Sequence, residues 1–167
     1  MADKEEVIKE RIEHSGIFDF SAFYSYVHEW FKEENYGVVE EKYNEKISGN
    51  TRDIKFEWLA TKKISDYFKS ETKLRFDITG LTDVEVEIDG TKKKTNKGRI
   101  WLEIKGNIIR DPESKWDVSP FFRFLRDFYN KYIIPARVDK ITDRIKDDVR
   151  DFKDDLKAYL DLTGKRI

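Results

Sequence analysis

The chain has 167 residues, enough for one domain with a core of its own, and contains no cysteine. Disulfides, thiolate metal sites and a cysteine nucleophile are therefore excluded. Its 33 basic and 34 acidic side chains nearly cancel, so the net charge does not indicate a polyanionic partner.

The chain is expected to form a single domain over residues 1–167. Its two parts are a body at 17–135 and a long charged helix at 136–162. The sequence has no apolar run long enough to cross a membrane, and its first residues are charged, unlike a secretory signal. These features predict a cytoplasmic protein.

Two segments precede the first predicted strand. Residues 3–14 are mostly charged, with Val7, Ile8 and Ile12 at helical spacing, and predict either a short, weakly held helix or a frayed segment. Residues 19–34 predict a stronger helix, because their apolar side chains recur on one face of a 3.6-residue period. These side chains are Phe20, Phe23, Tyr24, Val27, Trp30 and Phe31.

Between Gly37 and Arg110 apolar and charged side chains alternate, which is typical of strands with one face in water. The first predicted strand is the most polar, as expected of a sheet edge. The clearly patterned strands run over about 38–47, 52–62, 67–79, 82–88 and 99–109.

The dipeptide Asp89-Gly90 favours a two-residue type I′ hairpin. This turn would place Lys93 beside Val86 on the apolar side, which argues mildly against it. A turn at Asn96–Gly98 is the alternative. With the first turn, oppositely charged side chains pair across the strands, Lys92 with Glu87 and Lys94 with Glu85.

Ser119-Pro120 begins a predicted helix over 120–134, the most apolar segment of the chain. Pro135 then kinks this helix or starts a new one. The last predicted helix carries a narrow apolar stripe between charged flanks. It docks on the body, projects and pairs with another chain, or, as the least favoured alternative, lies on a membrane surface.

These elements predict an α+β fold whose sheet is an antiparallel up-and-down meander of five or six strands. The aromatic helix at 19–34 and the C-terminal helix at 120–134 are expected to cover its apolar face. The other face is expected to lie in water.

Catalytic and metal-binding patterns are lacking in the sequence. His14 and His28 do not pair with a nucleophile, and Glu57 and Glu103 lie among cations that predict cross-strand ion pairs. The aspartates of the last helix are spaced to pair with Lys and Arg on a solvated face. The sequence therefore predicts no enzyme, no cofactor and no metal site.

A binding or scaffolding protein with a protein partner, or with a second copy of itself, is the favoured prediction. Contact is expected through the last helix or through an apolar island on the open sheet face. The candidate residues on the helix are Ile141, Ile145, Val149, Phe152 and Leu156, and those on the sheet are Leu59, Trp101 and Ile109.

Two alternatives stay open. The first is a carrier that holds an apolar small molecule in a cavity between the sheet and the aromatic helices. The second is a weak nucleic-acid contact through the basic region 92–101. Its candidate residues are Lys92, Lys94, Lys97 and Arg99.

Overall fold

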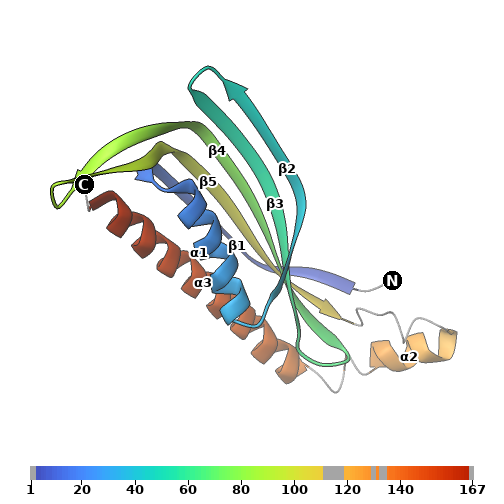
Figure 1. Cartoon of the computed structure of the whole chain (residues 1–167). Helices are drawn as coiled ribbons and strands as arrows, with labels where there is room; N and C mark the ends of the chain where they lie inside the picture. The colour runs from blue at the N-terminus through green and yellow to red at the C-terminus, as the bar shows by residue number, and fades with distance from the viewer. Residues whose placement is uncertain (1–2, 111–118, 129–130, 132–134, 166–167) are drawn as a thin grey trace.

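The computed structural model describes residues 3–110, 119–128, 131 and 135–165 of the chain. Five strands and three helices make up this part of the molecule (Figure 1). The strands are β1 (Asp3–Phe18), β2 (Gly37–Ser48), β3 (Thr51–Lys63), β4 (Phe68–Ile88) and β5 (Thr91–Arg110). The helices are α1 (Phe20–Glu33), α2 (Pro120–Phe128) and α3 (Pro135–Lys165).

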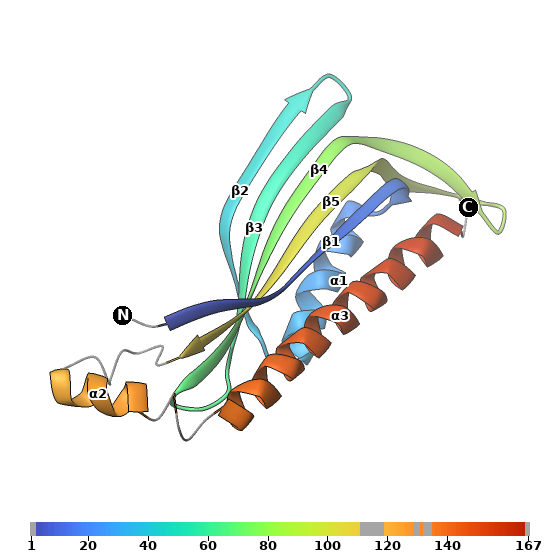
Figure 2. The same cartoon turned by 180° about the vertical axis from the view of Figure 1, so that it is seen from behind.

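All five strands form one antiparallel sheet in the order β1-β5-β4-β3-β2. The sheet curves around α1 and α3, which lie side by side on one of its faces (Figures 1 and 2). A mixed α/β structure with an antiparallel sheet is thus confirmed. The strands from β2 to β5 follow one another as a meander, and the polar β2 lies at an edge as predicted.

The hairpin between β4 and β5 turns at Asp89 and Gly90, whose φ angles are 52° and 79°. Positive values at both positions are what a type I′ turn requires. The predicted register is confirmed, because Glu87 pairs with Lys92, Glu85 with Lys94 and Val86 with Lys93. The alternative turn at Asn96–Gly98 is wrong, since these residues continue β5.

The strands predicted at 67–79 and 82–88 are one strand, β4, interrupted by a bulge. Its pairing with β5 shifts between Thr79 and Thr82, where two residues of β4 lie opposite Gly98. A Cβ on Gly98 would lie 3.1 Å from the Leu81 Cα, so this close approach favours glycine. The extra residue bends the ribbon and shifts its side-chain alternation by one.

The prediction of a helix at 3–14 is wrong, because these residues belong to β1. Ile8 and Ile12 are four residues apart, a spacing that places them on one face of a helix and equally on one face of a strand. The edge of β5 decides between the two, since β1 pairs with it from Asp3 to Phe18. Tertiary pairing therefore overrides an ambiguous local pattern.

The helix at 19–34 is confirmed as α1. The side chain of Asp19 accepts a hydrogen bond from the Ala22 N–H at 3.0 Å and so caps the helix start. Phe23, Val27 and Phe31 are buried against the sheet. This one-sided burial follows from their spacing of four residues.

The second covering helix is α3, which corrects the prediction for residues 120–134. Helix α2 occupies only 120–128 of that range and buries no residue. Residues 129–134 lie outside the described residues, apart from Lys131. Since α3 begins at Pro135 and packs on β1 and β5, the docked alternative for this helix holds.

Aromatic rings fill the space between the sheet and the two helices. Phe56 and Phe76 stack at 4.2 Å between ring centroids, and Phe23 meets Phe76 edge-on at 6.0 Å. On the helix side, Phe152 of α3 lies 4.7 Å from Phe31 of α1. Rings packed at such distances leave a filled core here.

Candidate functional site

The five candidate contact residues on α3 are buried in the core. Ile141 is 8% exposed, and Ile145, Val149, Phe152 and Leu156 are exposed by 2% or less. Their stripe packs against the sheet of the same chain, so it is not presented to a partner in this structure. The charged residues beside it anchor the helix instead. Asp155 accepts a hydrogen bond from Trp30, Asp148 from Tyr36, and Lys153 donates to Glu10, at 2.8–2.9 Å.

The apolar island predicted on the open sheet face is not continuous. Leu59 pairs with Val39 and Lys73, whereas Trp101 pairs with Asp77 two rows further along the sheet. Ile109 lies at the end of β5, paired with Lys4 on one side and Lys69 on the other. Charged side chains therefore separate the three candidates from one another.

The four candidate nucleic-acid contacts are exposed but divide between two faces of β5. Lys92 and Lys94 are even-numbered positions of this strand, while Lys97 and Arg99 are odd-numbered. Because β5 pairs without an extra residue of its own, alternate positions point to opposite sides. The register does not gather them into one basic surface.

The carboxylates considered for catalysis form ion pairs. Glu57 lies 3.7 Å from the Lys42 amine and 3.2 Å from the Arg75 guanidinium. Glu103 lies 3.7 Å from Lys9 and 3.5 Å from Lys105. The contacts with Lys42, Arg75 and Lys9 agree with the predicted cross-strand pairing, whereas Lys105 lies on the same strand as Glu103.

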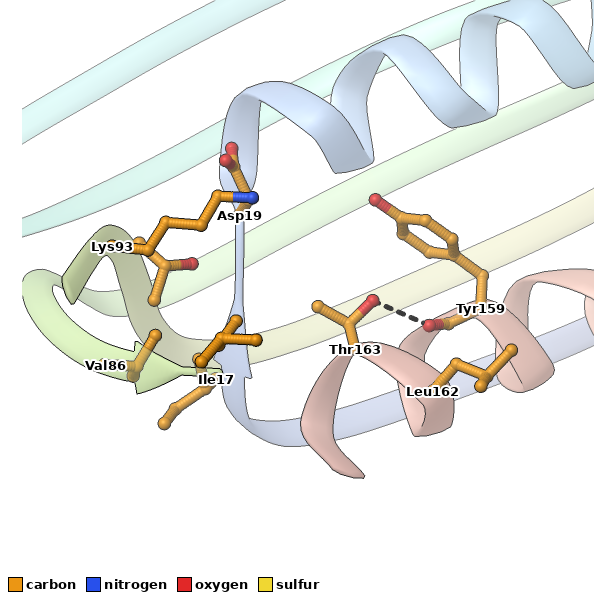
Figure 3. Close-up of a pocket in the computed structure, with 9 residues that line it drawn as sticks. Ile17, Asp19, Val86, Lys93, Tyr159, Leu162 and Thr163 are labelled. Carbon is orange, nitrogen blue, oxygen red and sulfur yellow. Dashed lines mark hydrogen bonds between the residues drawn. The ribbon is translucent and has the colours of Figure 1, made fainter. Parts of the chain in front are cut away.

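A hollow with apolar walls opens where the tip of the β4–β5 hairpin approaches the end of α3. We call it the mouth pocket, and its volume is about 240 Å³. Figure 3 shows Ile17 and Val86 on one side of it and Tyr159, Leu162 and Thr163 on the other. The residues that line it are Ile17, Asp19, Val86, Ile88, Lys93, Thr95, Tyr159, Leu162 and Thr163.

The bulge in β4 determines which hairpin side chains reach this pocket. Before the bulge, apolar residues such as Ile78 pair with even-numbered positions of β5 and face the core. After it, Val86 pairs with Lys93 and Val84 with Thr95. The apolar side chains of the hairpin tip thus lie on the other face of the ribbon, where Val86 and Ile88 line the pocket.

The opposite wall comes from the last turns of α3. The Thr163 hydroxyl donates to the Tyr159 carbonyl at 2.8 Å, which closes the helix end with a local hydrogen bond. The ring of Tyr159 stacks on Tyr26 of α1 at 4.2 Å. Leu162 keeps 58% of its surface exposed, so this wall is both apolar and accessible.

Two charged side chains lie among the apolar residues that line the mouth pocket. Asp19 is the cap of α1, and Lys93 comes from the hairpin. Burial raises the pKa of Tyr159 above its usual value, and the negative charge of Asp19 adds to this. Tyr159 therefore stays a neutral phenol at physiological pH. The pocket combines one cation, one anion and several hydroxyl groups with an apolar wall.

A more polar hollow adjoins the mouth pocket and shares Asp19 and Thr95 with it. Its further lining includes Asp83, Lys94 and Asn96.

The sequence contained one sign of the mouth pocket. The hairpin register brings Lys93 to the side of Val86, and this counted against the turn rather than for a site. A lysine among apolar neighbours at a sheet margin can cover them with its stem and keep its amine in water. The contributions of Ile17 and of Leu162 depend on long-range packing and had no local signal.

Comparison with known proteins adds no assignment. No protein-family model matches the chain, and no significant similarity links it to a curated protein or to a solved structure.

Proposed function

We propose that this protein binds a small, mainly apolar molecule in the mouth pocket. The main observation that supports this proposal is the shape and chemistry of the pocket. Its apolar walls come from β1, the β4–β5 hairpin and α3, and a few polar groups lie among them. Such a combination is the usual form of a small-molecule site. It differs from the predicted carrier cavity in its place, since the rings between the sheet and the helices pack closely.

The volume limits the size of the ligand. The pocket has a volume of about 240 Å³. This holds a small organic molecule or one end of a larger one, whereas a long acyl chain would not fit inside. Part of the ligand would remain at the rim, where Leu162 is exposed.

Lys93 favours a ligand with an anionic group. Lys93 lines the pocket and is exposed, so its amine supplies a positive charge at the rim. Asp19 also caps α1 through Ala22, so part of its hydrogen-bonding capacity is already used. We therefore expect an apolar body with a single acidic or neutral polar group to bind best.

Two fluorescent probes test this proposal with the full chain. Anilinonaphthalene sulfonate has an apolar body and an anionic group, while phenylnaphthylamine has a similar body without the charge. Leu162→Arg should lower the affinity for both by about tenfold or more, because it places a charge in the apolar wall. Lys93→Glu should lower the affinity for the sulfonate alone.

Val39→Arg is the matched control. Val39 is 62% exposed on the edge strand β2, so it also replaces an exposed apolar side chain with arginine, away from the pocket. Both probes should bind this variant as tightly as the wild type. If Leu162→Arg and Val39→Arg have the same effect, or the wild type binds neither probe, the mouth pocket is not a ligand site.

Contact with a protein or nucleic-acid partner at the originally predicted residues has less geometric support. The stripe of α3 is buried, and the basic side chains near the hairpin lie on two faces. Both functions remain untested predictions.

A further inference from the structure

Helix α2 exposes its phenylalanines to a degree that no other helix of the described chain approaches. Phe121 and Phe124 are 65% and 64% exposed, and Phe122 and Phe128 are 45% and 46% exposed. Large apolar side chains gathered in water mark an interaction surface more often than isolated ones do. The aromatic residues of α1, β3 and β4 are instead buried or half-buried.

The helix has two chemically distinct sides. At about 100° per residue, Phe121, Phe124 and Phe128 share one arc with Leu125. Arg123, Arg126 and Asp127 occupy the opposite arc. The side chain of Arg126 is only 12% exposed, but Asp127 on the same arc is 72% exposed and Arg123 is exposed as well, so both the phenylalanine arc and most of the polar arc face solvent.

The neighbouring end of α3 is positively charged. Residues 135–146 carry four cations and two aspartates, whereas residues 147–165 carry four cations and six aspartates. Figures 1 and 2 both place α2 at the end of the molecule where α3 begins. Aromatic side chains and an excess of positive charge therefore occur at the same end.

We propose that α2 binds to the surface of an anionic phospholipid membrane. Phe121 and Phe124 would insert at the boundary between headgroups and acyl chains. Arg123 and the cations at the start of α3 would contact the acidic headgroups. No helix among the described residues is long and apolar enough to cross a bilayer.

This inference goes beyond the proposed ligand site and does not depend on it. The mouth pocket lies at the other end of α3, a helix of 31 residues and so about 46 Å long. A protein attached through α2 would keep the pocket accessible to water.

Flotation with lipid vesicles tests the membrane contact. The full chain should float with vesicles of equal parts phosphatidylcholine and phosphatidylserine, and should bind vesicles of phosphatidylcholine alone much more weakly. The double variant Phe121→Glu, Phe124→Glu should bind these vesicles about tenfold or more weakly. It lacks the two aromatic rings whose transfer from water into the membrane would stabilise the bound state. Arg123→Glu should weaken binding to the mixed vesicles and reduce its dependence on salt.

The matched control is the double variant Val39→Glu, Ile47→Glu. These side chains are 62% and 69% exposed on β2, and their replacement should leave vesicle binding unchanged. Circular dichroism should give the same unfolding temperature for the α2 variant and the wild type, since α2 buries no residue.

Three results would overturn the proposal. The wild type could fail to float with mixed vesicles, or the two double variants could float equally well. Light scattering could also show a wild-type dimer that the α2 variant converts to a monomer, which would assign the phenylalanines to a second copy. Probe binding in the mouth pocket should persist in the α2 variant, so the two proposals fail separately.

Discussion

The two helices that follow the sheet, α3 and α2, use their apolar side chains in different ways. α3 is rich in Asp, Lys and Arg, yet Phe152 and Leu156 within it are completely buried. α2 has a denser run of Phe, yet it buries no residue. Apolar content alone thus does not decide which helix covers a sheet. The stripe of α3 is narrow but long, and it matches the curved face along β1 and β5 that α2 is too short to cover.

The largest expected effect is the difference in stability between two single variants, one that truncates a ring in α3 and one that truncates a ring in α2. Phe152→Ala should lower the free energy of unfolding by about 3–5 kcal/mol, because the ring is fully buried between Phe31 and Trp30. Phe124→Ala should change it by less than about 0.5 kcal/mol. Urea unfolding followed by circular dichroism measures both. Equal losses would mean that α2 is part of the core.

The close contact between α3 and the sheet gives the next prediction. A Cβ on Gly106 would lie 2.7 Å from the Ile8 side chain and 3.0 Å from that of Ile145. Gly106→Ala should therefore destabilise the fold by about 1–3 kcal/mol, because α3 or β1 must move. Gly164→Ala near the end of α3 is the control, since its Cβ would meet open space. A neutral Gly106→Ala would show that α3 lies less tightly against β5.

The smallest effect concerns a polar anchor of α3. The Tyr36 hydroxyl donates to Asp148 at 2.9 Å and lies 3.2 Å from the Ser70 hydroxyl. Tyr36→Phe should cost about 0.5–1.5 kcal/mol at neutral pH, measured by urea unfolding. The α2 variant Phe124→Ala provides the comparison, because it removes no such anchor.

Alkaline pH sharpens this test. Burial raises the pKa of Tyr36 well above 10, and burial together with Glu40 raises the pKa of Tyr24 to about 12. The folded state thus favours the protonated phenols. Their contribution is complete below about pH 10 and is lost as the pH rises through the folded-state pKa values. The stability advantage of wild type over Tyr36→Phe should shrink above pH 10, and a constant difference would contradict the role of burial.

Local patterns were enough to predict several elements. The hairpin register followed from Asp89-Gly90, because only a few residue pairs accept two successive positive φ angles. Helix α1 followed from its aromatic periodicity, and the structure adds the cap at Asp19. In both cases the physical cause lies within a few residues of the element itself.

The errors share a different cause. Ile8 and Ile12 fit a helix and a strand equally well, and only the free edge of β5 selected the strand. The phenylalanines of 120–128 predicted a buried helix, but α1 and α3 already occupy the covered face of the sheet. The candidate site shows the same limit, because its walls come from β1, the hairpin and α3.

By itself, the sequence determined the strand alternation and the apolar stripes of α1 and α3 and favoured the correct hairpin turn, since neighbouring residues decide these. Tertiary structure decided which edge β1 completes, which helix covers the sheet, and where Val86 faces after the bulge. These outcomes depend on contacts between residues far apart in the chain, and several segments compete for the same surface. The fit of α3 to the curved face decides which helix covers the sheet. The register shift opposite Gly98 decides which side of the ribbon Val86 faces.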